Sequence, residues 1–283
     1  MLPPEIEKVL SFQIFAAREL GGGSINQVYF LSTSKGSFCI KFNQAEAFPG
    51  MFQAEARGLS LIESSDAIRV PSVIEAVTLT NYSYLLLEYL EPFRKIQDFM
   101  VEFGHSLARL HMNTNTDFGL DHDNYIGSLP QQNRWYDDWI SFFVEERLGY
   151  QISLARKSGL LPYDTMKQFQ RLFPRLKSYF PKEKPALIHG DLWSGNFIVY
   201  EKGKPCLIDP AVYYGHRETD IAMTTLFGGF SSDFYSSYNE VFPMEQGWKG
   251  RMDLYNLYPL LVHLNLFGTG YLRLIYQVLK KYS

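Results

Sequence analysis

The 283-residue sequence predicts an α+β fold of two lobes, with a small antiparallel-sheet lobe over residues 1–90 and a larger, mainly helical lobe over residues 91–283. Three observations support this prediction. Short extended apolar runs fill the first third of the chain, apolar residues recur at helical spacing after Pro92, and no repeat or low-complexity linker separates the two parts. The boundary near residue 90 is therefore expected to join two lobes of one unit.

The small lobe is expected to begin with a helix from residue 5 to about residue 18, which the glycine triplet at 21–23 then ends. The runs INQVYFLST and SFCIKFN follow, and the turn residues of 34–36 between them predict a hairpin. A second hairpin is predicted from VIEAVTLT and YSYLLLEYL, which meet at Asn81. Glu91-Pro92 then ends the β-rich part.

A helix is predicted between the two hairpins, over residues 51–64. Its apolar residues Phe52, Leu59 and Ile62 share one face, and Glu55 lies on that same face. A carboxylate on an apolar face needs a partner, because burying an unpaired charge is costly.

The larger lobe carries several helical patterns. Helical spacing of apolar residues begins at Ile96 and continues to Leu110, and amphipathic stretches occupy roughly 133–157 and 162–179. One β-like island interrupts them, ALIHGDLWSGNFIVY followed by KPCLIDP, and it is rich in functional side chains.

Composition narrows the class of protein. A net charge of −3 and a pI near 6.1 give no electrostatic reason to expect binding to a phosphate backbone, which needs a concentrated basic surface, so nucleic acid is not an expected partner. Two cysteines are too few for a disulfide framework and favour the cytoplasm. The first residues lack the pattern of an export signal, and the apolar stretch at 257–279 is interrupted by polar residues and glycines, which argues against a membrane span. The sequence carries no signal for an oligomeric state.

The strongest functional signal lies in the β-like island, in the run HGDLWSGN. Asp191 and Asn196 have the D-x-x-x-x-N spacing of a kinase catalytic loop, in which the aspartate accepts the proton of the substrate hydroxyl and the asparagine binds Mg²⁺. Asp209, on the next predicted strand, matches the second Mg²⁺ ligand. Phosphoryl transfer depends mainly on positioning and charge neutralisation, and carboxylate and amide oxygens are the ligands that Mg²⁺ prefers. The alternative is an ordinary surface turn of Asp, Asn, Ser and Gly, which explains the loop but not the later aspartate.

The small lobe supplies the other parts that a kinase-like fold needs. The segment Gly21–Asn26, with Gly22, Gly23, Ser24 and Asn26, can place backbone N–H groups over the phosphates of ATP. Lys41 can reach the α- and β-phosphates, and Glu55 can hold it by an ion pair. The segment Glu88, Tyr89 and Leu90 is the expected hinge whose backbone binds adenine. The small lobe is thus predicted to bind the nucleotide, and the larger lobe to carry the catalytic and substrate residues.

Simpler interpretations remain for each of these residues. The glycines can be a flexible hinge, Lys41 and Glu55 can be unrelated surface charges, and Tyr89 can pack at a strand end. A Walker-type NTPase is disfavoured because the G-x-x-x-x-G-K-[ST] run is missing. His105 and His111 lie six apart on one predicted helix and are expected to be structural, not metal ligands.

Nearly the whole chain resembles the fructosamine kinases, also called ketosamine kinases, which are relatives of aminoglycoside and choline kinases. The resemblance rests on GGGSINQVY, the lysine of FCIKF, AEARGL, LLLEYL, LIHGDLWSGN, LIDPAVYYGHRETDIAMTTLFGGF and LYPLLVHLNLFGTGYL. The wider superfamily shares only the H-G-D-x-x-x-x-N run and the later aspartate. The tryptophan within HGDLWSGN and the DPAVYYGHRE segment make the resemblance specific.

The resemblance implies ATP-dependent phosphorylation of the 3-hydroxyl of a ketose attached to an amine, as in glycated lysine. The product is unstable and releases the amine, so such enzymes resemble protein-repair kinases that carry out deglycation. It also implies that Asp191 is the base, that Asn196 and Asp209 are the metal ligands, and that Lys41 and Glu55 position the phosphates. Where many members have a cysteine in the glycine-rich loop this chain has Ser24, which argues against a thiol switch.

Substrate contacts are the least determined part. Trp193 offers a flat apolar surface beside the base for a sugar or a lysine stem, and His216 with Arg217 can support the site or approach the substrate. The alternatives are core packing for Trp193 and an ion pair of Arg217 with Glu218 or Asp220. Two other functions stay open, a small-molecule kinase of the choline or aminoglycoside type and a pseudokinase that binds nucleotide without transfer.

Overall fold

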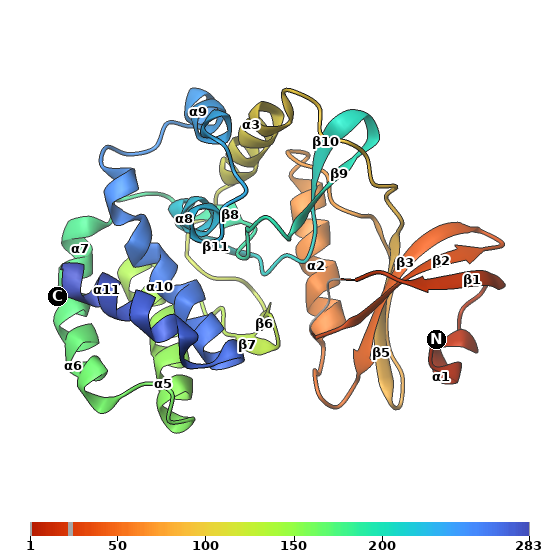
Figure 1. Ribbon diagram of the computed structural model, residues 1–283, viewed down its shortest axis with the longest axis horizontal. Helices are drawn as coiled ribbons and strands as arrows, with labels where there is room; N and C mark the ends of the chain where they lie inside the picture. Colours follow the sequence, from red (N-terminus) through yellow and green to blue (C-terminus); the bar gives the residue numbers. More distant parts are fainter. Residues whose placement is uncertain (1, 22–24, 283) are drawn as a thin grey trace.

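The computed structural model describes residues 2–21 and 25–282 and divides into a sheet-rich and a helical lobe (Figure 1). The first lobe contains α1 (Pro4–Glu7), β1 (Ile14–Glu19), β2 (Gln27–Thr33), β3 (Gly36–Gln44), α2 (Met51–Ser64), β4 (Val73–Thr78) and β5 (Tyr82–Glu88). Its five strands form one antiparallel sheet in the order β1-β2-β3-β5-β4. The two predicted hairpins and the helix over residues 51–64 are confirmed.

The predicted helix over residues 5–18 is wrong. Only Pro4–Glu7 is helical, and Ile14–Glu19 is the edge strand β1, in which Ala17 pairs with Leu31 of β2. Most side chains of β1 are exposed, so the apolar residues of this segment do not mark a buried helix face. The segment is held by main-chain pairing with β2, and the spacing of apolar residues within β1 carries no information about such pairing.

The larger lobe is mainly helical, with short strand pairs embedded in it. Its helices are α3 (Phe99–His111), α4 (Trp139–Phe142), α5 (Tyr150–Lys157), α6 (Tyr163–Leu172), α7 (Leu176–Tyr179), α8 (Glu218–Leu226), α9 (Ser232–Val241), α10 (Trp248–Phe267) and α11 (Leu272–Tyr282). Its strands are β6 (Asn124–Ile126), β7 (Leu129–Gln131), β8 (Ala186–Ile188), β9 (Phe197–Tyr200), β10 (Lys204–Leu207) and β11 (Tyr213–Gly215). A π-helical segment, Phe143–Gly149, joins α4 to α5, and 3-10 turns occupy Phe173–Arg175, Glu201–Gly203 and Thr269–Tyr271.

Two helices begin later in the structure than the sequence predicts. The stretch from residue 133 becomes helical only at Trp139, because residue 136 pairs in extended form with Phe118. The helix predicted from Ile96 begins at Phe99. Within that helix His111 is buried between Tyr238 and Asp220, and His105 contacts Glu240, so both histidines have the structural role that was predicted.

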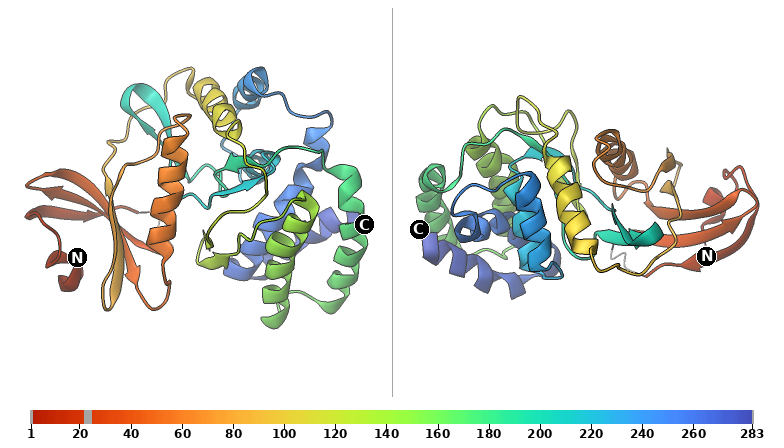
Figure 2. Two further views of the ribbon diagram at one scale, coloured as in Figure 1. Left: turned by 180° about the vertical axis from the view of Figure 1, so that it is seen from behind. Right: turned by 90° about the horizontal axis from the view of Figure 1, so that it is seen from above.

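Two apolar cores hold the lobes. A small core lies on one face of the sheet and includes Ile6, Ile40 and Phe42, and a large core fills the helical lobe and continues to α2. Helix α2 packs on the sheet face that is turned toward the helical lobe (Figure 2). In the part of the chain that the structure describes, none of the helices combines the length and apolar character needed to cross a bilayer.

Candidate active site

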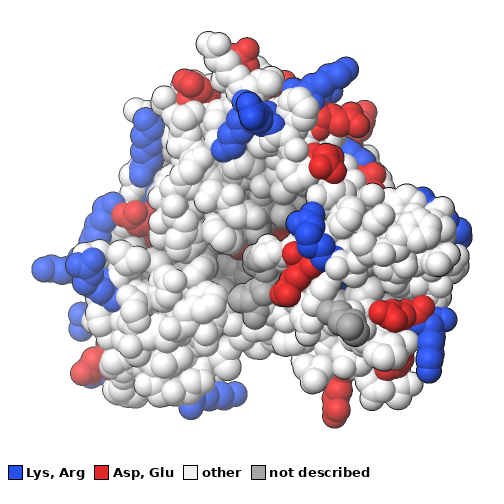
Figure 3. All heavy atoms as spheres, turned by 45° about the vertical axis from the view of Figure 1, so that its right-hand side comes forward, with Lys and Arg blue, Asp and Glu red and all other residues white. Residues whose placement is uncertain are grey.

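A cavity of about 210 Å³ lies between the lobes, where the molecule is hollowed (Figure 3). It is lined by residues from the sheet lobe, the β6–β7 hairpin, the loop after β8 and helix α10. The lining residues are Ile25, Asn26, Val28, Lys41, Met51, Glu55, Asn124, Tyr125, Ile126, Gly127, Asp191, Trp193, Asn196, Asp209, Pro210, Val262, His263, Leu266 and Phe267. Segments more than 200 residues apart in sequence thus face one cavity.

Lys41 is held between two carboxylates. Strand alternation turns Ile40 and Phe42 into the small core and Lys41 to the opposite face, where α2 presents Glu55. Lys41 Nζ lies 2.6 Å from Glu55 Oε1 and also pairs with the carboxylate of Asp209. Burial alone would lower the pKa of Lys41, but the charges of Asp209 and Glu55 raise it above its ordinary value. The lysine therefore stays protonated and links the two lobes.

Asp209 has an unusual backbone. Its φ of 54° lies in the left-handed region, which non-glycine residues rarely adopt. Such a conformation costs free energy and persists where the surrounding structure enforces it, often at functional sites. The backbone N–H of Ile208 donates to the Asn196 carbonyl at 3.0 Å, which fixes the segment against the loop after β8. The Asp209 side chain is 49% exposed, so it remains open to the cavity.

Asp191 and Asn196 form one unit. The Asn196 side-chain amide donates to the Asp191 backbone carbonyl and to its carboxylate, each at 2.8 Å. Burial raises the pKa of Asp191 to about 7, although the hydrogen bond from Asn196 opposes the shift, and the charge of Asp209 adds to it. A carboxylate with such a pKa can accept a proton near neutral pH.

Two buried residues hold the loop that carries Asp191. His189 Nδ1 accepts the Asp191 backbone N–H at 3.2 Å, and its Nε2 lies 2.9 Å from the Ile208 carbonyl oxygen, so Nε2 carries the hydrogen. Burial lowers the pKa of His189, which keeps the ring neutral. Asp220 accepts the backbone N–H groups of His189 at 2.7 Å and Gly190 at 2.9 Å. Sequence reasoning missed Asp220, which lies 29 residues from Asp191 and follows no catalytic spacing.

Gly190 is needed at its position for steric reasons. Its φ is +82°, and a Cβ atom there would lie 2.1 Å from the Ala211 carbonyl oxygen. The close approach brings the loop that carries Asp191 against the segment after Asp209. Substitution of Gly190 is therefore expected to displace one of the two acidic residues from the cavity.

An aromatic rim borders the cavity on the side of Trp193. The Trp193 ring covers Gly195, whose added Cβ would lie 2.3 Å from the ring, and it packs edge-on against Phe227 at 6.0 Å. Phe227 in turn contacts His263 at 4.8 Å between ring centroids. Phe227, His263 and the β6–β7 hairpin were not predicted as site residues. The run VHLNLFG did contain His263, but one histidine in an apolar helix gives no functional spacing.

The remaining predicted residues are only partly in the cavity. Asn26 lines it and accepts a hydrogen bond from Asn43 at 2.9 Å. Gly22, Gly23 and Ser24 lie outside the described residues. Tyr89 packs on Phe30 at 4.6 Å, and Tyr89 and Leu90 are half-buried where the chain passes between the lobes.

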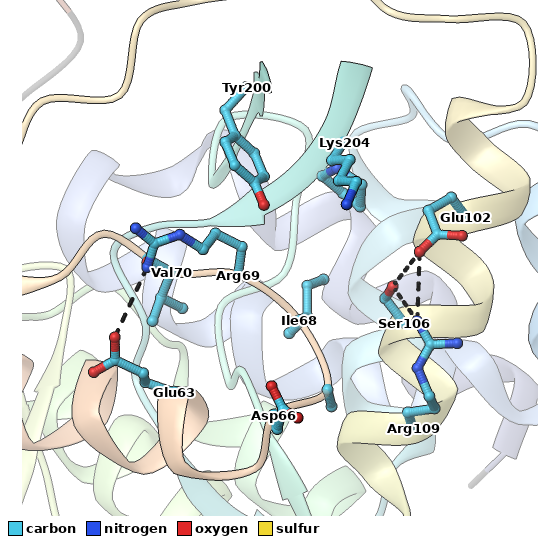
Figure 4. A pocket seen from close by; sticks show the side chains of 12 residues that line it. Glu63, Asp66, Ile68, Arg69, Val70, Glu102, Ser106, Arg109, Tyr200 and Lys204 are labelled. Carbon is cyan, nitrogen blue, oxygen red and sulfur yellow. Dashed lines mark hydrogen bonds and ion pairs between the residues drawn. The ribbon is translucent and has the colours of Figure 1, made fainter. Parts of the chain in front are cut away.

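Glu88 does not line the cavity between the lobes but pairs with Arg69, a lining residue of a second cavity, of about 400 Å³ (Figure 4). The Glu88 carboxylate also accepts the Ser72 backbone N–H at 3.0 Å. Arg69 lines this second cavity together with Glu63, Tyr200 and Lys204. None of the catalytic candidates lines it, so its larger volume does not make it the site of the chemistry.

His216 and Arg217 do not line the cavity, so the structure gives no support for direct contact with a substrate. His216 is buried, stacks on Trp139 at 4.5 Å and lies 2.9 Å from the Tyr255 hydroxyl. Arg217 is also buried and pairs at 3.0 Å with Glu183, not with Glu218 or Asp220 as the alternative had it. Both side chains therefore point into the core, where aromatic rings surround His216 and a carboxylate neutralises Arg217.

The fold and the cavity define a class of protein. A lysine and a helical glutamate from a five-stranded lobe, facing an aspartate, an asparagine and a second aspartate from a helical lobe, are the parts of a protein-kinase-like phosphotransferase. The fold is shared with a ternary complex of the aminoglycoside phosphotransferase APH(4)-Ia with AMP-PNP and hygromycin B, at 14% identity and a TM-score of 0.64 over 97% of this chain and 96% of the other.

The chain belongs to the fructosamine kinase family, whose model matches residues 6–283. A "Probable ketoamine kinase" of Synechocystis sp. is 44% identical over 95% of this chain and 91% of its own length. The chloroplastic protein-ribulosamine 3-kinase of Arabidopsis thaliana is 40% identical over 92% of this chain and 80% of its own. A crystal structure of a "putative fructosamine-3-kinase" from Thermobifida fusca superposes with a TM-score of 0.87 at 31% identity, over 97% and 96% of the two chains. The predicted family, fold class and enzyme class, an ATP-dependent kinase, are confirmed.

Proposed function

We propose that the protein transfers the γ-phosphoryl group of ATP to the 3-hydroxyl of a ketosamine, the sugar adduct of an amine or of a protein lysine. The observation that carries the proposal is the convergence of the Lys41–Glu55–Asp209 ion-pair cluster and the Asp191–Asn196 pair on one cavity, in a chain of the fructosamine kinase family. The Arabidopsis relative is a protein-ribulosamine 3-kinase, which supports the position of the hydroxyl.

Asp191 is the proposed base. The bond from the substrate oxygen to phosphorus forms as the bond from that phosphorus to the bridging oxygen of ADP breaks, and the hydroxyl proton passes to the Asp191 carboxylate. The hydrogen bond from Asn196 orients this carboxylate before the substrate arrives. His189 and Asp220 fix the loop by backbone hydrogen bonds, so the base is preorganised.

Asn196 and Asp209 are the proposed ligands of Mg²⁺. Among the described residues, no three His, Cys, Asp or Glu side chains gather as a metal cage. A site with one amide oxygen and one carboxylate nevertheless suits Mg²⁺, which usually keeps water and phosphate oxygens as its other ligands. The amide nitrogen of Asn196 is directed at Asp191, which leaves its oxygen for the metal. When bound, Mg²⁺ would neutralise charge on the phosphate oxygens.

The nucleotide is proposed to lie between Lys41 and the chain crossing at residues 88–90. Lys41 would contact the α- and β-phosphates, with Glu55 holding it in place. The backbone of Glu88, Tyr89 and Leu90 would meet adenine, because the Glu88 side chain is already committed to Arg69. Asn26 and the segment Gly22–Ser24 would cover the phosphates.

The substrate is proposed to lie beside Trp193, which is 38% exposed at the rim of the cavity. Its flat ring suits the apolar face of a sugar or the stem of a lysine. Phosphorylation at the 3-position makes the adduct unstable, so the amine is released and the reaction serves deglycation and protein repair. We propose the cytoplasm as the compartment, where the free thiols of Cys39 and Cys206 stay reduced.

An ADP-release assay tests the proposal. Purified protein is given ATP, Mg²⁺ and lysine adducts of four-, five- and six-carbon ketoses, with choline and kanamycin in parallel. Turnover with a ketosamine but not with choline or kanamycin is the expected result, and mass spectrometry should place the phosphate on the 3-oxygen. Turnover only with choline or kanamycin would contradict the substrate class, and ATP binding without any turnover would indicate a pseudokinase.

A further inference from the structure

One segment of the larger lobe has a charge opposite to that of the rest of the protein. Residues 153–184 contain eight Lys and Arg but two Asp and Glu, whereas the rest of the chain contains 19 and 28. The eight basic residues, all exposed, are Arg156, Lys157, Lys167, Arg171, Arg175, Lys177, Lys182 and Lys184. We call them the basic face.

The charge of the basic face is not neutralised internally. The segment 153–184 contains two carboxylates. Asp164 pairs with Lys167 at 3.2 Å, and Glu183 turns inward to pair with Arg217. In the described structure the other seven cations form no ion pair. Lys and Arg side chains gather along the outer edge of the larger lobe in the space-filling view (Figure 3). Clustered like charges at a surface attract an oppositely charged partner.

The basic face also offers apolar contact. Tyr163 is 69% exposed and lies beside Arg156 at 5.8 Å and Lys167 at 5.7 Å. A cavity of about 400 Å³ opens nearby, lined by Arg156, Lys157 and the apolar side chains of Ile152, Met166 and Phe173. A partner with acidic and apolar side chains close together would satisfy both features, as in protein interfaces where charged groups surround an apolar centre.

Helix α5 connects the basic face to the candidate active site. Asn265 of α10 donates to the backbone carbonyl and the side-chain oxygen of Gln151 on α5, at 3.0 and 2.7 Å. Leu266 and Phe267, the next residues of α10, line the catalytic cavity. Arg156 and Lys157 follow Gln151 by about one and a half turns of α5. The helix on which the basic face begins therefore adjoins the helix that lines the catalytic cavity.

We propose that the basic face is a docking surface for acidic regions of proteins that carry the ketosamine. This inference rests on the proposed function, because it concerns the protein-bound form of the same substrate. A folded or extended protein fits better than nucleic acid or an anionic membrane. The remainder of the chain is strongly acidic and would repel a long or flat polyanion, and the cavity beside Arg156 has apolar walls for amino-acid side chains.

The test uses the triple variant Arg171→Glu, Arg175→Glu, Lys177→Glu. Its matched control reverses three exposed cations of the small lobe, Lys8→Glu, Arg18→Glu and Lys35→Glu. Both are assayed with ribulosylated serum albumin, which is acidic, ribulosylated lysozyme, which is basic, and a free ribulose-lysine. The basic-face variant should lose about tenfold in kcat/KM on the acidic protein at low salt, mainly through KM. Its activity on the free adduct should match wild type, and its activity on lysozyme should not fall, because the reversed charges no longer repel a basic protein.

Several results would overturn the docking surface. They are an equal loss on the free adduct, no loss on albumin, or the same loss in the control variant. Poly(A) and vesicles containing phosphatidylserine serve as competitors, and binding to either that is tighter than binding to albumin and is lost in the variant would assign the basic face to that partner instead. Activity of the wild type on free ribulose-lysine tests the proposed function separately, so the two failures are distinguishable.

Discussion

The side-chain amide of Asn196 donates a 2.8 Å hydrogen bond to the carboxylate of Asp191. This contact joins the proposed base to a proposed metal ligand. It favours the ionised form of Asp191, whereas burial favours the protonated form and raises the pKa to about 7. The balance between the two effects sets the pH range in which the base is active.

The pH dependence of the reaction follows from this balance. Because Asp191 must be ionised to accept a proton, kcat/KM should fall as the pH is lowered through about 7, by roughly tenfold per pH unit well below the pKa. In Asn196→Ala the opposing hydrogen bond is lost, so the acidic limb should move to higher pH. Rates measured from pH 5.5 to 9 test this, and a wild-type rate that is flat down to pH 5.5 would contradict it.

Replacing the base separates chemistry from binding. Asp191→Asn should lower kcat by about 10²–10⁴-fold, since it removes general-base catalysis, and should leave the Kd for ATP nearly unchanged. Isothermal titration with a non-hydrolysable ATP analogue measures the second quantity. Full activity in the variant would exclude Asp191 as the base.

The same variant should be more stable than wild type at pH 8. The raised pKa of Asp191 means that stability falls as the pH rises from the unfolded value near 4 to about 7, because the folded protein then holds an ionised carboxylate in a desolvated site. A neutral amide removes this cost, and the melting temperature should rise by about 2–4 °C. At pH 4 the difference should vanish, so equal gains at both pH values would show another cause.

Loss of the lysine alone should destabilise the protein more than loss of the lysine together with the charge of Glu55. Lys41→Met leaves the carboxylates of Glu55 and Asp209 facing each other without a cation, and should cost about 3–5 kcal/mol in urea denaturation, as for a broken buried pair. Adding Glu55→Gln should restore part of this loss. Additive losses in the double variant would show that the two residues are not coupled.

Trp193 and Gly195 are predicted to act together on substrate binding. A methyl group at Gly195 would lie 2.3 Å from the Trp193 ring and must displace it. Gly195→Ala and Trp193→Ala should each raise KM for the ketosamine by about tenfold, which corresponds to the contact energy of one aromatic side chain, with KM for ATP unchanged. Gly250→Ala is the matched control, because a Cβ there meets no neighbour within 4 Å. A rise in KM for ATP alone would contradict the placement of the substrate.

Much of the fold follows from local patterns. The helix over residues 51–64 and both hairpins were predicted because their apolar residues repeat with the period of the element that buries them. Strand β1 was missed because it is an exposed edge strand, held mainly by main-chain pairing with β2. His216 and Arg217 were predicted as possible substrate residues, but they contact Trp139 and Glu183 instead. The sequence could not show this, because the direction of a side chain depends on elements that are distant in the chain.

The sequence by itself determined the family and the fold class, and it was enough to propose Lys41, Glu55, Asp191, Asn196 and Asp209 as site residues, because motif spacing and residue type are local properties. Only the tertiary structure decided that Asp220 holds the loop that carries Asp191, and that His263 lines the cavity and contacts Phe227. These features arise where segments far apart in the chain pack together, and packing is set by the burial of the whole core, not by the spacing within one segment.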